Sequence, residues 1–305
     1  MAAFPAIASE RPETEEQLKA IGPVNGLPPA LQRALATEDF TPLPAPGPQD
    51  WLAVHPEPGQ TFEEFQRSQP NRPDEERRII YLQPLGNFPE KQSPSTEMLR
   101  QYAAALFQME VKILPSVNIV PGSFTTRTNR TTNRRQILTR DVLRWSQGHL
   151  PEDAFCLLGI TMEDLYPNPS WNFVFGEASL RERVGVYSFA RYDPAFYGGA
   201  QEGDYQKLLL WRSAKVLTHE TAHMFGLAHC IHFKCVMNGS NHLQESDARP
   251  QHLCPVCLRK LQWSIGLDVV KHYENLHQFC QRAGFEDEAA WIARRLKELR
   301  EDGYK

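Results

Sequence analysis

The sequence lacks long apolar runs and any large excess of one charge. No apolar stretch approaches the ~20 residues that a membrane-spanning helix requires. The formal net charge is −4, from 33 basic and 37 acidic residues, which gives no global electrostatic case for nucleic-acid binding. The opening residues, MAAFPAIASERPETEE, lack the basic start and apolar segment of a secretory signal. We therefore expect a cytoplasmic protein whose partners are neither membranes nor nucleic acids.

Cysteine is also sparse, with 6 in 305 residues. In a reducing compartment disulfides are rare and thiols remain available to metal ions. Without a signal segment, the N-x-[ST] sequences at Asn129 and Asn238 are read as chance. At this length, with 41% hydrophobic residues, the chain can bury the core of one large domain or two smaller ones.

The stretch HETAHMFGLAH has the spacing of a catalytic metal site. His219 and His223 are four residues apart, so on a helix they lie about 6 Å apart on one face and both reach one ion at roughly 2 Å. Glu220 is placed about 100° around the helix, beside the metal. Gly226 can end the helix in the left-handed conformation, and the turn returns His229 as a third ligand. The alternative, two solvated histidines on an exposed turn, is disfavoured by the added glycine and histidine.

Four cysteines follow with the spacing C-x4-C-x18-C-x2-C. Two short-spaced pairs separated by a longer loop are typical of a structural zinc site. The four are Cys230, Cys235, Cys254 and Cys257. Between the pairs, Met237 precedes an Asn-Gly turn signal. By default such a methionine fills a gap in a core, but it stands eight residues after His229, where metzincin peptidases place a methionine turn.

These motifs resemble the archaemetzincin family of zinc metallopeptidases. The likeness rests on HExxHxxGxxHCxxxxCVM, followed by Glu245, Asp247, Arg249, Pro250 and LCPVC. Residues 79–89 and 157–167 also match the family's pattern, so the resemblance covers roughly residues 50–275. One feature of other metzincins is missing. Astacin-type enzymes carry a tyrosine two residues after the turn methionine, and position 239 is glycine here.

The resemblance implies a metzincin-like fold of the α/β (α+β) class. This fold has a twisted mixed sheet, an active-site helix and a smaller C-terminal helical subdomain that carries a structural zinc. We expect a proline-rich extension at residues 1–70, serving as a linker or wrapping the domain. A catalytic domain would follow at 71–305, divided into an upper subdomain (71–226) and a lower subdomain (227–305).

The resemblance also implies two zinc ions and a peptidase mechanism. His219, His223 and His229 would bind the catalytic zinc and the four cysteines the structural one. Glu220 would be the general base that activates a zinc-bound water to hydrolyse a peptide bond. Two alternatives remain open. One is a zinc-stabilised module that binds peptides with little or no turnover, and the other is a thiol redox sensor at CPVC.

Several strands and helices are expected from periodicity and caps. Strands are predicted at 78–82, 111–120, 155–161, 171–175 and 183–192, and helices at 29–36, 61–69, 97–108, 137–145, from 205 to Gly226, and 286–300. Residues 123–136 contain four arginines, and we favour a solvated loop over a patch that binds anions or nucleic acid. By resemblance alone, the last strand before the active helix would be a peptide-binding sheet edge, with packing for stability as the alternative. The residues assigned to that edge are Gly185, Val186, Tyr187, Ser188, Phe189 and Ala190.

Overall fold

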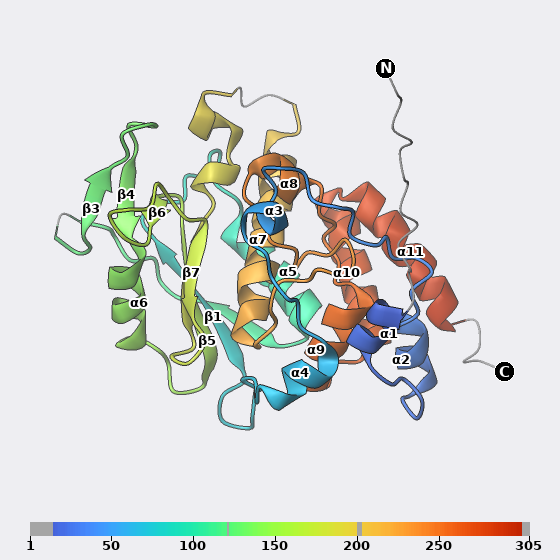
Figure 1. Cartoon of the computed structure of the whole chain (residues 1–305). Coiled ribbons are helices and arrows are strands. Elements are labelled where there is room, and N and C mark those ends of the chain that lie inside the picture. The colour runs from blue at the N-terminus through green and yellow to red at the C-terminus, as the bar shows by residue number, and fades with distance from the viewer. Residues whose placement is uncertain (1–14, 121, 200–202, 301–305) are drawn as a thin grey trace, which may run out of the picture.

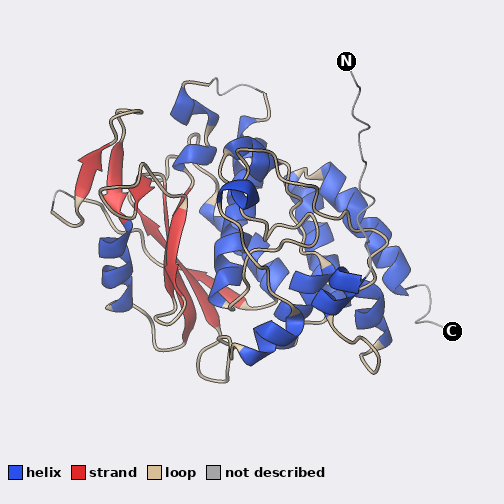
Figure 2. Ribbon diagram, viewed as in Figure 1, coloured by secondary structure: helices blue, strands red, loops and turns tan. Residues whose placement is uncertain are grey.

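A computed structural model describes residues 15–120, 122–199 and 203–300. The strands gather in one half of the molecule and helices fill the other (Figure 2). Helix α7 (Tyr205–Met224) stands between the sheet and the C-terminal helices (Figure 1). In the described part of the chain, no helix combines the length and apolar character needed to cross a membrane.

The main sheet is mixed, with strand order β2-β1-β5-β8-β7. Strands β2 (Glu110–Ile113), β1 (Ile79–Leu85), β5 (Ala154–Thr161) and β8 (Val184–Ser188) run parallel, and β7 (Gly176–Ser179) is antiparallel to β8. The α/β class and the mixed sheet are therefore confirmed.

Strands β1 and β5 form the buried centre of this sheet, and every residue in both is buried. Alternate side chains point to opposite faces. Ile80 and Leu158 belong to the large core beneath the sheet, whereas Tyr81 and Leu157 belong to a smaller core on the other side. Burial on both faces explains the nearly continuous apolar runs of these strands.

The edge of the sheet is not where we expected it. Strand β8 pairs with β5 on one side and with β7 on the other, so β8 is an interior strand and β7 is the edge. The prediction that residues 185–190 form the edge is therefore wrong. In agreement with an interior position, all six residues are buried, namely Gly185, Val186, Tyr187, Ser188, Phe189 and Ala190. The strand also ends at Ser188, and a 3-10 helix, η1 (Ala190–Tyr192), follows it.

Helices cover both faces of the sheet. α5 (Thr96–Phe107) begins after Ser95, whose hydroxyl accepts a hydrogen bond from the Met98 N–H. Its residues Leu99, Tyr102 and Leu106 are buried. α6 (Thr139–Gln147) packs on the opposite core with Val142 and Leu143. It starts two residues later than predicted because residues 137 and 138 belong to β4 (Arg135–Leu138).

Three predictions in the upper half are wrong. The strand expected at 111–120 ends at Ile113, since Pro115 has no N–H to donate to a ladder. Residues 123–136, expected as a solvated loop, form the hairpin of β3 (Thr126–Thr128) with β4, and β6 (Asp164–Tyr166) extends that sheet. Residues 171–175 form no strand and make only an isolated bridge from Val174 to Leu165.

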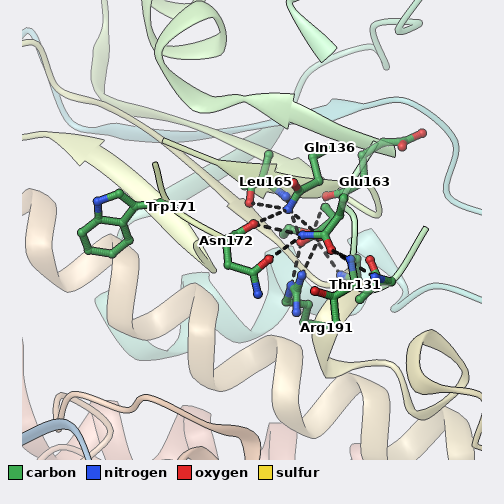
Figure 3. A network of polar contacts seen from close by, with 12 residues as sticks. Thr131, Gln136, Glu163, Leu165, Trp171, Asn172 and Arg191 are labelled. Atoms are coloured by element: carbon green, nitrogen blue, oxygen red, sulfur yellow. Dashed lines mark hydrogen bonds and ion pairs between the residues drawn. The ribbon is translucent and has the colours of Figure 1, made fainter. Parts of the chain in front are cut away.

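Residues 167–175 are held instead by side chains of the hairpin. Arg127 donates hydrogen bonds to the carbonyls of Pro169 and Asn172, and Gln136 donates to Asn172 as well. Gln136 also donates to Asp164, which forms a buried two-pronged ion pair with Arg191 at 2.8 Å. Figure 3 shows these groups converging while the ring of Trp171 points away from them.

The part of the chain after α7 is helical, as predicted. It contains α8 (Leu243–Asp247), α9 (Pro255–Ile265), α10 (Val269–Ala283) and α11 (Glu286–Arg300). The apolar residues Ala289, Ile292, Leu296 and Leu299 of α11 are buried in the main core, so this helix packs on its own chain.

The N-terminal segment wraps this helical half. Its helices are α1 (Glu15–Ile21), α2 (Pro29–Ala34), α3 (Trp51–Val54) and α4 (Phe62–Arg67). Contacts of α1 and α4 with α9, and of α2 with α10 and α11, hold it in place. The wrapping role is thus supported for residues 15–70, and residues 1–14 lie outside the described part. The boundaries at 70 and 226 stay predictions.

We expect Asp164→Ala to lower the free energy of unfolding by about 3–5 kcal/mol, because it leaves the Arg191 guanidinium buried without its carboxylate. Urea denaturation followed by circular dichroism measures this change. Glu163→Ala is the matched control, since its ion pair with Arg135 is partly exposed to solvent and should contribute less than about 1 kcal/mol. Equal losses in the two variants would contradict the role given to the buried pair.

Candidate metal centre

The last two turns of α7 present two histidines to one point. The rings of His219 and His223 have centroids 4.6 Å apart, and their Nε2 atoms are separated by 3.1 Å. The helix ends at Met224, and Gly226 adopts a φ of +83°, which a glycine tolerates best. At the other end, the Asp204 side chain does not cap the helix and pairs instead with Lys207.

The turn at Gly226 brings His229 back against the other two histidines. Its ring centroid lies 5.1 Å from those of both His219 and His223. One ring nitrogen of each histidine lies within 4.8 Å of the corresponding atoms of the other two. The three residues predicted as ligands are therefore together.

Each histidine has an acceptor for its other ring nitrogen, Nδ1. His219 Nδ1 lies 2.9 Å from the Val236 carbonyl oxygen, and His223 Nδ1 lies 2.6 Å from that of Leu227. His229 Nδ1 lies 2.9 Å and 3.0 Å from the two carboxylate oxygens of Glu57. Because carbonyls and carboxylates only accept, each Nδ1 donates its proton and each Nε2 keeps a free lone pair. This donor set fits a zinc ion.

Two of the three histidines, His219 and His223, are also held neutral. Burial lowers the pKa of His223 to about 4 and that of His219 well below its ordinary value, with further lowering by neighbouring imidazoles. Neutral imidazole is the form that binds a metal. His219 and His223 can therefore take up an ion at neutral pH without first losing a proton.

Glu220 lies beside this cluster in a cleft of about 540 Å³. Burial raises the pKa of its carboxyl to about 7, against smaller opposing effects of His229 and Arg249. The start of β7 approaches it closely: a Cβ on Gly176 would lie 3.3 Å from Glu220 Cδ. A larger residue at 176 would crowd the carboxylate.

The cleft has apolar and aromatic walls. Six of its lining residues are Trp51, His55, Trp171, Phe175, Leu180 and Tyr192. Edge strand β7 lines it through Gly176, Glu177 and Ala178. Among the described residues, Tyr192 is the tyrosine that lines this cleft. Burial raises the pKa of its hydroxyl.

The four predicted cysteines form a second, fully buried cluster. The four Sγ atoms all lie within 4.8 Å of one another, and those of Cys230 and Cys254 are 3.5 Å apart. Hydrogen bonds from the neighbouring thiols, Cys235 first, hold the pKa of Cys230 well below its ordinary value. The Cys254 N–H donates to Cys235 Sγ at 3.2 Å. Thiolates supported by backbone N–H groups suit a structural zinc.

Comparisons with known proteins agree with this arrangement. The sequence model of Peptidase family M54 matches residues 117–263. Human archaemetzincin-2 is 42% identical over 269 residues, covering 79% of this chain and 74% of the relative. Human archaemetzincin-1 is 33% identical, covering 76% of this chain and 52% of the relative. The crystal structure of archaemetzincin from Archaeoglobus fulgidus is 30% identical with a TM-score of 0.46, covering 60% of this chain and 99% of that one.

The chain belongs to the archaemetzincin family. It is accordingly a zinc-dependent metallopeptidase that acts on peptide or protein substrates, as the resemblance of the motifs implied. Membership of this family does not favour the alternative of a peptide-binding module without turnover.

The turn around Met237, which follows the three histidines in the sequence, supports their site. Met237 is fully buried, and its carbonyl accepts a hydrogen bond from the Cys230 N–H. Asn238 donates to the carbonyls of Cys230 and Phe233. Since Val236 accepts from His219, this turn joins the histidine site to the cysteine cluster.

The glycine that replaces the astacin-type tyrosine has a structural reason in this archaemetzincin. A Cβ on Gly239 would lie only 2.3 Å from Trp51 Cδ1. The indole of Trp51 therefore occupies the space that a side chain at position 239 would need. The N-terminal segment supplies an aromatic group at the place where the turn has none.

Three residues near the site were not assigned from the sequence. Glu57 and Trp51 come from the N-terminal segment, and no local spacing connects them with His229. Arg249 was part of the family pattern but received no role. Its buried guanidinium donates to the Asn238 carbonyl at 2.5 Å and reaches within 3.4 Å of His219 Nδ1.

Proposed function

We propose that this chain hydrolyses peptide bonds in the cleft beside α7, with Glu220 as the general base. The observation that carries the proposal is the position of one partly buried carboxylate beside three histidines whose free Nε2 atoms face a common point. His219, His223 and His229 would hold the catalytic zinc. Zinc bound there supplies a Lewis acid and lowers the pKa of its water to about 7.

Glu220 moves the proton in this proposal. Its carboxylate accepts a proton from the attacking water and delivers it to the amine of the leaving peptide. The walls of the cleft shield the carboxylate from bulk solvent, which strengthens its interaction with the proton it carries.

A second zinc at the four cysteines would have a structural role. Four thiolate ligands fill a tetrahedral site and leave no open position for a substrate. All four cysteines are buried, which also disfavours a redox sensor at CPVC because such sensors are accessible to oxidants. Two zinc ions per chain follow from this proposal.

The substrate would bind along β7. In the β7–β8 ladder, the Ser188 N–H donates to the Phe175 carbonyl. Because hydrogen-bonded and non-hydrogen-bonded pairs alternate in an antiparallel ladder, Gly176 and Ala178 direct their backbone groups away from β8. An extended peptide can pair with these groups as an additional strand.

Replacing Glu220 by glutamine should lower kcat by about 10²- to 10⁴-fold, because the amide cannot accept the water proton. Mass-spectrometric profiling of a diverse peptide mixture measures the cleavage, and zinc analysis checks that the metal is retained. Glu182→Gln changes an exposed carboxylate in the turn after β7, outside the lining of the cleft, and should keep most of the activity. Full activity of Glu220→Gln would exclude its assigned role.

Cys257→Ala should reduce the zinc content from two ions per chain to one, since three thiolates leave the tetrahedral site incomplete. Atomic emission spectroscopy of the purified protein counts the zinc. Cys280→Ala is the control, because this buried thiol lies on α10 outside the cluster and should leave both ions bound. Two ions in Cys257→Ala would contradict the assigned ligand set.

Ala178→Pro should raise KM about 2- to 10-fold, as expected from losing one hydrogen bond of about 0.5–1.5 kcal/mol. Proline removes the N–H that an added strand would use. Ala178→Ser keeps this N–H and should leave KM nearly unchanged. Steady-state kinetics on a peptide identified by the profiling experiment compares the variants, and equal KM values would argue against binding along β7.

A further inference from the structure

The N-terminal segment reaches the third histidine from far away in the sequence. Figure 1 shows α3 and the chain beside it passing in front of α7. Just after α3, Glu57 places both carboxylate oxygens at 2.9 and 3.0 Å from His229 Nδ1. Glu57 lies outside the residues matched by the family's sequence model, which begins at residue 117.

His229 is the histidine with a charged acceptor. The other two donate to backbone carbonyls, of Val236 and Leu227, that lie within 17 residues of them. A carboxylate accepts a stronger hydrogen bond than a carbonyl does and increases the electron-donating power of the imidazole on its far side. His229, the third histidine of the site, is thus the one whose orientation depends on the N-terminal segment.

Glu57 is itself fixed by its neighbours. The Trp51 indole N–H donates to Glu57 Oε1 at 2.9 Å. The Trp51 ring meets the His229 ring edge to face, with centroids 5.2 Å apart. The Trp51 side chain therefore contacts both Glu57 and His229.

Trp51 is anchored on the turn that follows Met237. Its backbone N–H donates to Glu245 Oε1 at 2.9 Å, and its ring fills the space above Gly239. Asp50, the preceding residue, lies 3.1 Å from His242 Nε2. These contacts fix the start of α3 on the lower half of the cleft, so that Glu57 is presented at a defined place.

We propose that Glu57 is a positioning residue of the metal centre: its carboxylate holds the His229 imidazole in the tautomer and orientation that direct Nε2 at zinc. This inference rests on the proposed role of His229 as a ligand. Residues 50–57 are then a working part of the active site, in addition to wrapping the domain.

Glu57→Ala should weaken binding of zinc at the histidine site by about 10- to 100-fold, the usual loss when the partner of a ligating histidine is removed. Competition with a chelator of known affinity measures the change in the full-length protein. Cobalt(II) substitution reports on the two sites separately, because only the cysteine site gives thiolate charge-transfer bands. The d–d bands of the histidine site should weaken or shift while the thiolate bands stay.

Glu63→Ala is the matched control, since it removes an exposed carboxylate from α4 of the same segment. It should bind zinc and cobalt as the wild type does. Glu57→Gln keeps an acceptor oxygen without the charge and should give an affinity between those of the wild type and Glu57→Ala. Unchanged thiolate bands in each variant show that the fold is intact.

Affinity and cobalt spectra of Glu57→Ala that match those of Glu63→Ala would overturn the proposal. The comparison needs no substrate. Failure of the wild type to cleave peptides would therefore bear on the peptidase mechanism and not on this inference.

Discussion

The active centre depends on one constraint: three imidazoles must turn the same ring nitrogen toward one point. Each can do so only if an acceptor takes the proton on its other nitrogen. The fold draws these acceptors from separate places, namely the turn before Met237, the bend after Gly226 and the N-terminal segment at Glu57. The helix supplies the spacing of His219 and His223, but the surrounding chain determines their orientation.

Buried cations join α7 to the lower half of the molecule. Lys215, one turn before His219, donates to the carbonyls of Ser246 and Arg249 at 2.8 and 3.1 Å, and burial lowers the pKa of its ammonium group to about 7. Arg212, one turn further back, forms an ion pair with Asp247. The active helix is therefore fixed on two sides, by the sheet through apolar contacts and by the loop around α8 through polar ones.

Local patterns predicted the parts of the structure that depend on local physics. The spacing of His219 and His223, the stop at Gly226 and the apolar run of β5 could be read directly, because a helix period or a buried strand leaves its mark on consecutive residues. The edge strand was misplaced because Gly-Glu-Ala-Ser in β7 has no apolar pattern, while the more apolar β8 lies inside the sheet. Glu57 was missed because its partner lies 172 residues further along the chain, a separation at which no periodicity operates.

That separation affects when the metal centre can fold during synthesis of the chain. Chains emerge from the ribosome N-terminal end first, so Glu57 is exposed long before His229 has been made. The segment around α3 can take its final place only after the turn at Gly239 has been synthesised, and contacts of such sequence separation form slowly. The contact between Glu57 and His229 can therefore form only after both His229 and the turn at Gly239 have been synthesised, and until then a nascent chain lacks an ordered hydrolytic site.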